Sequence, residues 1–219
     1  MERIPEPELM DDPEQARAYA GADFSEPHQA FIERFARCFP RQRPQRVLDL
    51  GCGAADITIR FARAYPDCAL TGVDGAPAML ALARVAIGHA GLSSRVTLCQ
   101  ALLPESSLPR HVFDTIISNS LLHHLPNPLV LWRAIGDYAQ PQAAVFTMDL
   151  RRPDTHAQAG RLVNEYAGTE PEVLRRDFLN SLLAAYCPEE IAMQLKQTSL
   201  SHLQVEAVGD RHVLVYGYL

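Results

Sequence analysis

Short apolar runs alternate along the chain with longer stretches in which apolar residues recur every three or four positions. Such runs are too short for helices and are typical of buried strands. They occupy residues 47–50, 68–73, 95–100, 112–118 and 143–148. Because strands that alternate with helices build a parallel sheet covered by helices, the pattern predicts an α/β fold of the Rossmann-like, doubly wound type.

The longer stretches carry helix start signals. Ser25 and Asn127 each stand where a helix N-cap is expected, with a proline in the first turn. Helices are predicted over residues 13–20, 25–38, 54–65, 77–88 and 128–139, and after Pro171 and Pro188. Residues 154–170 lack a clean period and include Gly160 and Gly168. Residues 203–207 and 213–215 alternate as strands around Gly209-Asp210, which predicts a hairpin.

The stretch from Val47 to Asp56 combines a predicted strand, a glycine turn and the start of a helix. Gly51 and Gly53 allow positive φ and lack a Cβ, so the backbone can turn sharply and let a ligand approach its amides. A dinucleotide site has a third glycine three places later, but Asp56 stands there. This carboxylate, with Asp49 just before the turn, would repel a diphosphate and suit a cationic ligand.

The next predicted strand ends in Asp74, about twenty residues after the glycines, where an acid can bind two ribose hydroxyls. A ligand with a ribose and a positive charge but no diphosphate fits S-adenosylmethionine better than NAD. Asp74 could also be a plain helix cap before Ala76. Asp49 needs a partner, since a buried unpaired charge is costly; the following helix amides and the ligand's ammonium are both candidates.

These residues resemble the class I S-adenosylmethionine-dependent methyltransferases. Residues 47–53 (Val-Leu-Asp-Leu-Gly-Cys-Gly) are similar to the first motif of that family, and residues 72–74 (Gly-Val-Asp) to the second. Residues 113–119, followed by Leu-Leu-His-His-Leu-Pro, look like its fourth-strand segment. The resemblance implies a mainly parallel seven-stranded sheet with an antiparallel last strand. It also implies S-adenosylmethionine as cofactor and S-adenosylhomocysteine as product.

The resemblance implies a cofactor site at the carboxyl ends of the strands. The residues expected there are Asp49, Gly51, Cys52, Gly53, Asp74, Gly75, Gln100, Ala101 and Asn119, with Tyr19 from an N-terminal helix folding over the cofactor. The chain departs from the family after the third strand, where Gln100-Ala101 replaces an acidic and a small residue. The Gln100 amide or the Ala101 backbone would then bind adenine. Tyr19 could equally be a packing residue of its helix.

Methyl transfer from a sulfonium requires mainly that donor and acceptor be held in line. An acceptor that carries a proton also needs a base, and the candidates are His123, His124 and Asp149, with Tyr166 as a further option. The resemblance favours His124 as the structural member of the pair and leaves His123 freer for substrate; both histidines could instead be structural. Arg151 and Arg152 could clamp an anionic acceptor, and Asp149 could simply pair with them.

Composition narrows the class of protein. For a chain of 219 residues, a formal net charge of −6 argues against a surface that binds nucleic acid. Its five cysteines are scattered, and neither they nor the remaining histidines have metal-ligand spacing, so no metal is predicted. No apolar run approaches a membrane span, and no signal peptide is evident. We therefore expect a cytoplasmic protein, and leave open whether it forms a homodimer.

The expected organisation is one methyltransferase domain over residues 1–219. Residues 1–40 would form an N-terminal helical cap, 45–150 the cofactor-binding core, 151–200 a helical excursion that serves as a substrate lid, and 201–219 the hairpin. The expected function is methyl transfer to a small-molecule acceptor. Two alternatives stay open: a protein that binds S-adenosylmethionine without turnover, and a nicotinamide-dependent oxidoreductase. The absence of a Pro-Pro-aromatic set after Asn119 argues against exocyclic amine acceptors.

Overall fold

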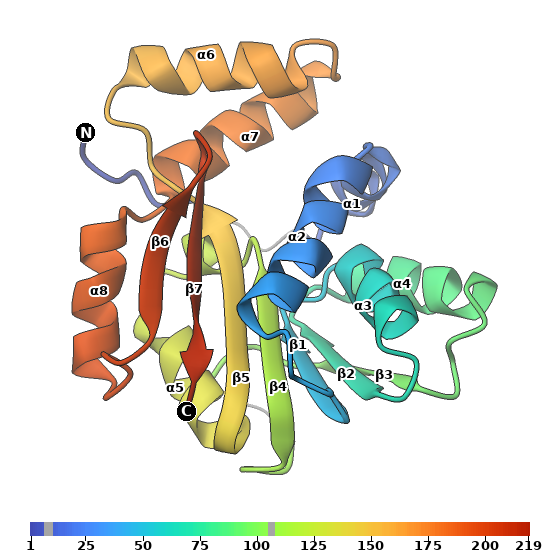
Figure 1. Ribbon diagram of the computed structural model, residues 1–219. Helices are drawn as coiled ribbons and strands as arrows, with labels where there is room; N and C mark the ends of the chain where they lie inside the picture. Colours follow the sequence, from blue (N-terminus) through green and yellow to red (C-terminus); the bar gives the residue numbers. More distant parts are fainter. Residues whose placement is uncertain (7–10, 105–107) are drawn as a thin grey trace.

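A seven-stranded sheet with the strand order β3-β2-β1-β4-β5-β7-β6 forms the centre of the structure (Figure 1). The computed structural model describes residues 1–6, 11–104 and 108–219. The first five strands pair in parallel, and β7 runs antiparallel to both β5 and β6. This arrangement confirms the predicted Rossmann-like sheet with an antiparallel last strand.

The strands begin and end close to the predicted apolar runs. They are β1 Arg46–Leu50, β2 Ala69–Asp74, β3 Val96–Gln100, β4 Phe113–Asn119, β5 Ala139–Leu150, β6 Gln204–Val208 and β7 His212–Tyr218. β5 is longer than expected because it begins at Ala139, directly after the preceding helix, and its pairing with β4 shifts register near Phe113. The predicted hairpin is formed by β6 and β7.

Helices cover both faces of the sheet. They are α1 Pro13–Gly21, α2 Ser25–Cys38, α3 Asp56–Ala64, α4 Pro77–His89, α5 Leu129–Tyr138, α6 His156–Ala167, α7 Glu172–Ala184 and α8 Pro188–Gln197, with a short 3₁₀ turn, η1, at Leu122–His124. Within the described parts of the chain, none of these helices has both the length and the apolar character needed to cross a bilayer.

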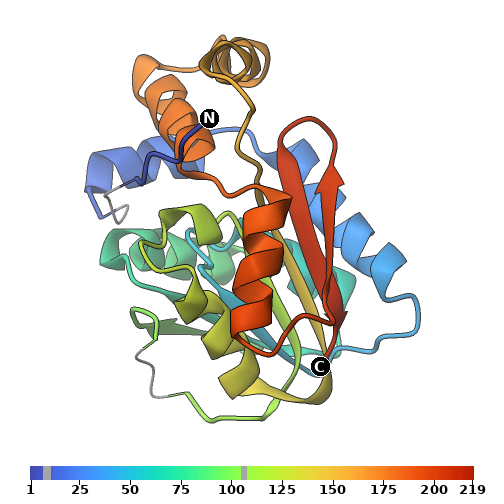
Figure 2. The same cartoon turned by 90° about the vertical axis from the view of Figure 1, so that its left-hand side faces the viewer.

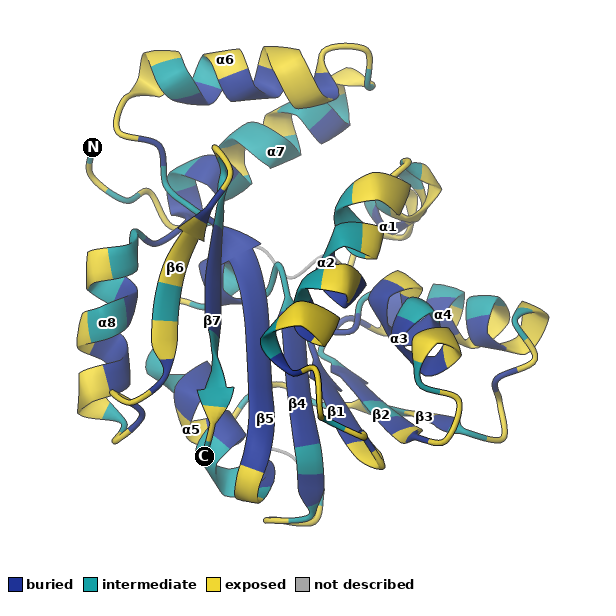
Figure 3. Ribbon diagram, in the orientation of Figure 1, coloured by how far each residue is buried: buried dark blue, intermediate teal, exposed yellow. Residues whose placement is uncertain are grey.

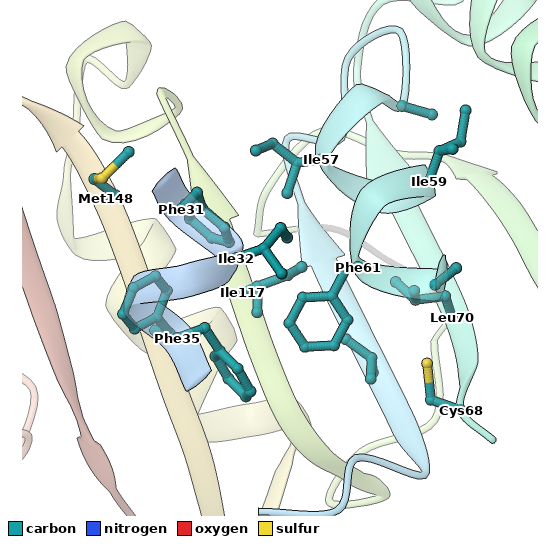
Figure 4. Packing of buried hydrophobic residues seen from close by; sticks show 14 of the residues in the cluster. Phe31, Ile32, Phe35, Ile57, Ile59, Phe61, Cys68, Leu70, Ile117 and Met148 are labelled. Carbon is teal, nitrogen blue, oxygen red and sulfur yellow. The ribbon is translucent and has the colours of Figure 1, made fainter. Parts of the chain in front are cut away.

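The central strands are largely buried (Figure 3). Because successive side chains of a strand point to opposite faces, the residues of these strands divide between two separate cores. On one face, Val47 and Ile117 pack with aromatic rings of α2 and α3, including Phe35 and Phe61, whose centroids lie 4.9 Å apart (Figure 4). On the other face, residues of β1, β4, β5 and β7 pack against α5 and α8. Both faces of the sheet are thus buried, as in other parallel sheets.

Two N-cap predictions were wrong, and one helix had no clear sequence signal. Residues 154–170, which lack a clean period in the sequence, contain α6, with Thr155 Oγ1 accepting from the Gln158 amide at 3.1 Å. Its buried Leu162 and Val163 pack with Leu182 of α7 and Leu150 of β5, contacts that a weak period does not reveal. The N-caps also differ: Phe24 precedes α2, and Pro128 precedes α5.

The helices α6 and α7 lie beyond the carboxyl end of β5, on the same side as the N-terminal arm, residues 1–6 (Figures 1 and 2). The arm is tied to the end of α7: Ile4 N donates to Leu183 O at 3.0 Å, and Arg3 Nε to Ala184 O at 2.6 Å. The sequence predicted an irregular arm over residues 1–12, of which 7–10 lie outside the described residues. The arm is extended, but it is held against the helical excursion.

Candidate functional site

The glycine turn after β1 is held against the end of β2. The amides of Gly51 and Cys52 both donate to Val73 O, at 2.8 and 3.0 Å. Gly51 has a φ of +75°, and a Cβ at this position would lie 2.9 Å from Leu121 Cβ. A side chain is therefore excluded here by backbone conformation and by space. The turn places its backbone at the carboxyl edge of the sheet, where open α/β sheets bind ligands.

Asp74 joins the glycine turn to the start of α4. Its two carboxylate oxygens accept from the amides of Gly53 and Ala76, each at 2.8 Å. Burial raises the pKa of Asp74, although these amide bonds act in the opposite direction. Asp74 is thus the cap before Ala76 that the sequence allowed, but a carboxylate that accepts two hydrogen bonds retains lone pairs for ligand hydroxyls.

Asp49 is buried within β1, with 1% of its surface exposed. The Thr58 hydroxyl donates to its carboxylate at 2.6 Å, so its protein partner is a side chain of α3 rather than the helix amides. Burial raises the pKa of Asp49 to about 7, with a further contribution from Asp74. A cationic ligand group nearby would favour the ionised form of this carboxylate.

A cavity of about 550 Å³ opens beside these residues. Eight predicted site residues line it: Tyr19, Asp49, Gly51, Cys52, Gly53, Asp74, Asn119 and His124. The volume is within the usual range for cofactor pockets, roughly 300–1,000 Å³. Tyr19 enters from α1, and burial, with nearby carboxylates, raises its pKa to about 12. The structure thus brings Tyr19 to the cavity from a helix far from the glycine turn in sequence.

Five predicted site residues are not among the described residues that line the cavity: Gly75, Gln100, Ala101, His123 and Asp149. Gln100 is exposed at the end of β3, and the Ala101 amide donates to Asp74 O at 3.0 Å. The Ala101 amide is therefore already used within the sheet edge. The adenine assignment stays a prediction.

The cavity wall also carries a charged group that the sequence pattern does not reveal. His28 Nδ1 lies 2.6 Å from Asp56 Oδ2, and Arg60 Nε donates to the same oxygen at 2.8 Å. Burial alone would raise the pKa of Asp56, but hydrogen bonds from His28 and Arg60 outweigh it and lower that pKa. Arg60 is the one guanidinium among the described lining residues, and it is already paired. A helical i,i+4 spacing could have revealed Arg60, whereas His28 comes from α2.

His123 and Asp149 form a buried pair beside the cavity. His123 Nδ1 lies 2.5 Å from Asp149 Oδ1, and the Leu122 amide donates to the other carboxylate oxygen at 2.7 Å. Burial opposes the charge on both groups, but their mutual attraction raises the pKa of His123 and lowers that of Asp149. Asp149 thus uses His123 and the η1 backbone as partners, not Arg151 or Arg152.

His124, not His123, lines the cavity, which corrects the expectation that His123 is the freer of the two. Adjacent residues of a 3₁₀ turn point in different directions, and Asp149 holds His123 inside, where 2% of its surface is exposed. Burial, followed by the neighbouring His123, lowers the pKa of His124 to about 3. The neutral imidazole is therefore the form that faces the cavity at neutral pH.

The other candidates at this edge are engaged elsewhere. Arg151 donates to Asp210 O at 3.1 Å, and Arg152 donates to Glu190 at 2.6 Å. Tyr166 donates to Asp210 at 2.7 Å on the surface. None of these three is among the described lining residues, so the predicted arginine clamp for an anionic acceptor is not formed at the cavity.

The chain is similar in sequence to known methyltransferases. Residues 47–142 match a family model described as a methyltransferase domain. A trans-aconitate 2-methyltransferase of Streptomyces coelicolor is 29% identical over 163 residues, covering 68% of this chain and 52% of the relative. The chain therefore spans about half the length of that relative.

Solved structures share the fold. An S-adenosylmethionine-dependent methyltransferase from Aquifex aeolicus superimposes with a TM-score of 0.68 at 18% identity, covering 94% of this chain and 98% of that one. A phosphoethanolamine N-methyltransferase 2 of Haemonchus contortus, in complex with S-adenosyl-L-methionine, gives 0.67 at 21% identity, covering 89% of this chain and 43% of that one. The three motifs in order, the sheet topology and the match of residues 47–142 to the methyltransferase-domain model together support a class I S-adenosylmethionine-dependent methyltransferase.

Proposed function

We propose that this protein transfers a methyl group from S-adenosylmethionine to a small-molecule acceptor by in-line displacement. The observation that carries the proposal is the glycine turn with Asp74 bonded to the Gly53 amide at the wall of the cavity. That wall offers a carboxylate to ribose hydroxyls and backbone to the rest of the cofactor. Asp49 and Asp56 beside it would attract a cationic sulfonium ligand and repel a diphosphate.

The cofactor would be bound by Asp49, Gly51, Cys52, Gly53, Asp74 and Asn119, with Tyr19 closing over it from α1. Gly75, Gln100 and Ala101 remain proposed adenine contacts at the adjoining sheet edge. On the acceptor side, we assign His124 to the cavity wall and the Asp149–His123 pair to its support. If the acceptor carries a proton, this group of three residues is the proposed source of the base.

The relative from S. coelicolor is named for trans-aconitate, which makes that compound a natural member of an acceptor screen. The described lining carries the carboxylates of Asp23, Asp49, Asp56 and Asp74 but only the guanidinium of Arg60. A polycarboxylate would find no unpaired guanidinium among these groups. The screen should therefore contain neutral and cationic acceptors as well as carboxylates.

The proposal is tested first by calorimetric titration with S-adenosylmethionine, S-adenosylhomocysteine and NAD. We expect the first two to bind and NAD not to bind. Asp74→Ala should weaken binding of the first two by about 1–3 kcal/mol, through lost hydrogen bonds to a charged group. Binding of NAD alone would instead support the nicotinamide-dependent alternative.

Transfer is tested with methyl-labelled S-adenosylmethionine and the acceptor screen. Incorporation into a small molecule supports catalysis, whereas tight cofactor binding without transfer to any acceptor would support the non-catalytic alternative. With the true acceptor, His123→Ala and His124→Ala should lower turnover while cofactor affinity is retained. Unchanged turnover in both variants would remove the histidines from the mechanism.

A further inference from the structure

Two histidines and one glutamate meet at the edge of the cavity. His123 and His124 lie on η1, and Glu6 comes from the N-terminal arm. One ligand atom of each residue, a ring nitrogen or a carboxylate oxygen, lies within 4.8 Å of the other two. The two imidazole rings are 4.0 Å apart between centroids. Imidazole and carboxylate together are the donor set that divalent transition metals prefer.

The surroundings of His123 match those of a metal-binding histidine. Asp149 engages Nδ1 at 2.5 Å, which leaves Nε2 as the nitrogen that can bind an ion. Metal-ligating histidines usually donate their second ring N–H to a carboxylate, which fixes the orientation of the ring. Asp149 is held in place by the Leu122 amide, so the orienting group is itself rigid.

His124 supplies an independent observation. Its Nδ1 is buried and makes no hydrogen bond within the described residues, although Glu6 Oε2 lies 3.3 Å away. Glu6 Oε2 is also an acceptor for the Ser181 hydroxyl at 3.1 Å, which directs the carboxylate toward this point. A buried nitrogen without a hydrogen bond costs free energy, and such groups in folded proteins commonly mark a site for an ion or water.

We propose that Glu6, His123 and His124 bind one divalent transition-metal ion, with Zn²⁺ as the probe. Ligand distances of roughly 2.0–2.2 Å place tetrahedral ligands about 3.4 Å apart. The farthest pair of the three atoms, which all lie within 4.8 Å of one another, therefore needs to approach by at most about 1.4 Å. Three protein ligands leave one coordination position open, as in catalytic rather than structural zinc sites.

The local charge favours a cation. The carboxylates of Glu6 and Asp149 face the cluster, while Arg3 is the cation packed against it. Arg3 Nη2 donates to the His123 carbonyl at 3.0 Å, and its guanidinium lies 4.1 Å from the centre of the Tyr186 ring. Arg3 is therefore occupied by the backbone and an aromatic face. With both histidines neutral, the four side chains Arg3, Glu6, His123 and His124 together with Asp149 carry one net negative charge.

The position gives the ion a consequence for ligand binding. Because His124 also lines the cavity, a bound ion would lie one side chain away from the cavity wall next to η1. Arg60, the guanidinium among the described lining residues, is already paired with Asp56. A bound ion would therefore provide an oxygen-bearing acceptor with a positive charge that the side chains alone do not offer. This inference goes beyond the proposed methyl transfer, and its test needs neither cofactor nor acceptor.

The test is a calorimetric titration of the 219-residue chain, freed of metal with a chelator, using Zn²⁺. Co²⁺ serves as a second probe, because its visible absorption reports coordination geometry. We expect one ion per chain and the intense absorption of a four- or five-coordinate Co²⁺ site. Glu6→Gln and His124→Asn should each weaken Zn²⁺ binding by at least tenfold. Asp149→Asn, which disturbs the orienting carboxylate, should weaken it by roughly 10- to 100-fold.

Matched controls lie outside the cluster. Glu2→Gln changes an exposed carboxylate on the same arm, and His202→Asn changes an exposed histidine before β6. Both controls should bind Zn²⁺ as the unmodified protein does, and circular dichroism should show that every variant is folded. No stoichiometric Zn²⁺ binding would overturn the proposal, as would equal affinity in Glu6→Gln and Glu2→Gln. Either result would leave S-adenosylmethionine binding, measured separately, unaffected.

Discussion

The site has two halves that are built in different ways: the cofactor wall of the cavity, and the cluster beside it at η1, of which His124 lines the cavity. The cofactor half uses Asp49, the Gly51 turn and Asp56, which are close in sequence, together with Asp74 at the end of the neighbouring strand. The half next to η1 combines residues from the N-terminal arm, η1, the end of β5 and α7. Its members are separated by up to 175 positions along the chain, as in the bond between Ser181 and Glu6.

Different interactions hold the residues of each half in place. A strand, a glycine turn and a helix set the cofactor half through backbone conformation, which is written locally in residue type. The half next to η1 is fixed by tertiary hydrogen bonds and buried charges, whose strength depends on how completely water is excluded. Mutations should therefore act mainly on ligand binding in the first half and mainly on stability in the second.

The largest expected effect is that of Asp149→Ala. This change leaves His123 buried without its carboxylate and the Leu122 amide without its acceptor. Removing one member of a buried ion pair costs about 3–5 kcal/mol of the free energy of unfolding. Urea denaturation of the metal-free protein measures this loss. A change below about 1 kcal/mol would show that the pair does not hold this half together.

Gly51→Ala should act on the cofactor half through both backbone strain and a clash with Leu121. We expect a loss of about 1–3 kcal/mol in stability and a marked loss of S-adenosylmethionine affinity. The matched control is Gly91→Ala, because Gly91 also has a positive φ, +70°, but open space around its Cβ position. Equal losses in stability and affinity for the two variants would show that the contact with Leu121 is unimportant.

The carboxyl of Asp49 predicts a pH dependence specific to the cofactor half. Its pKa of about 7 in the folded protein exceeds the ordinary value of 3.8, so the folded state binds the proton more tightly. The protonated Asp49 carboxyl thus contributes to the free energy of unfolding below about pH 4. This contribution is lost as the pH rises toward 7. A bound cationic cofactor would offset this loss of stability, because the cofactor favours the ionised form of Asp49.

Affinity for S-adenosylmethionine should consequently fall by up to about tenfold for each pH unit below 7, the limit for one ionisation. Calorimetry between pH 5 and pH 8 measures this slope, and Asp49→Asn should remove it. A slope that persists in Asp49→Asn would assign the dependence to another group.

The smallest expected effect is that of Thr155→Ala, at the N-terminus of α6. Loss of the hydrogen bond to Gln158 N should cost about 1 kcal/mol in thermal or urea denaturation. Because α6 belongs to the helical excursion, affinity for S-adenosylmethionine should be unchanged. A parallel loss of cofactor affinity would mean that the two halves are coupled.

The alternation of short apolar runs and helical periods was enough to predict the sheet, since each buried strand must be apolar on both faces. The glycine turn and Asp74 were also readable, because φ requirements and strand ends are local properties. Helix α6, by contrast, could not be recognised from local properties of the sequence. Its Leu162 and Val163 are buried against Leu182 of α7 and Leu150 of β5, so tertiary packing rather than its own period decides it.

By itself, the sequence determined the fold, the edge of the sheet that bears the site and the chemistry of the cofactor half. The tertiary structure alone decided which histidine faces the cavity, and it brought Glu6 and His28 to the site. The physical reason is the distance along the chain over which each effect acts. Backbone conformation and side-chain periodicity act within a few residues, whereas burial and ion pairing depend on segments that only the folded chain brings together.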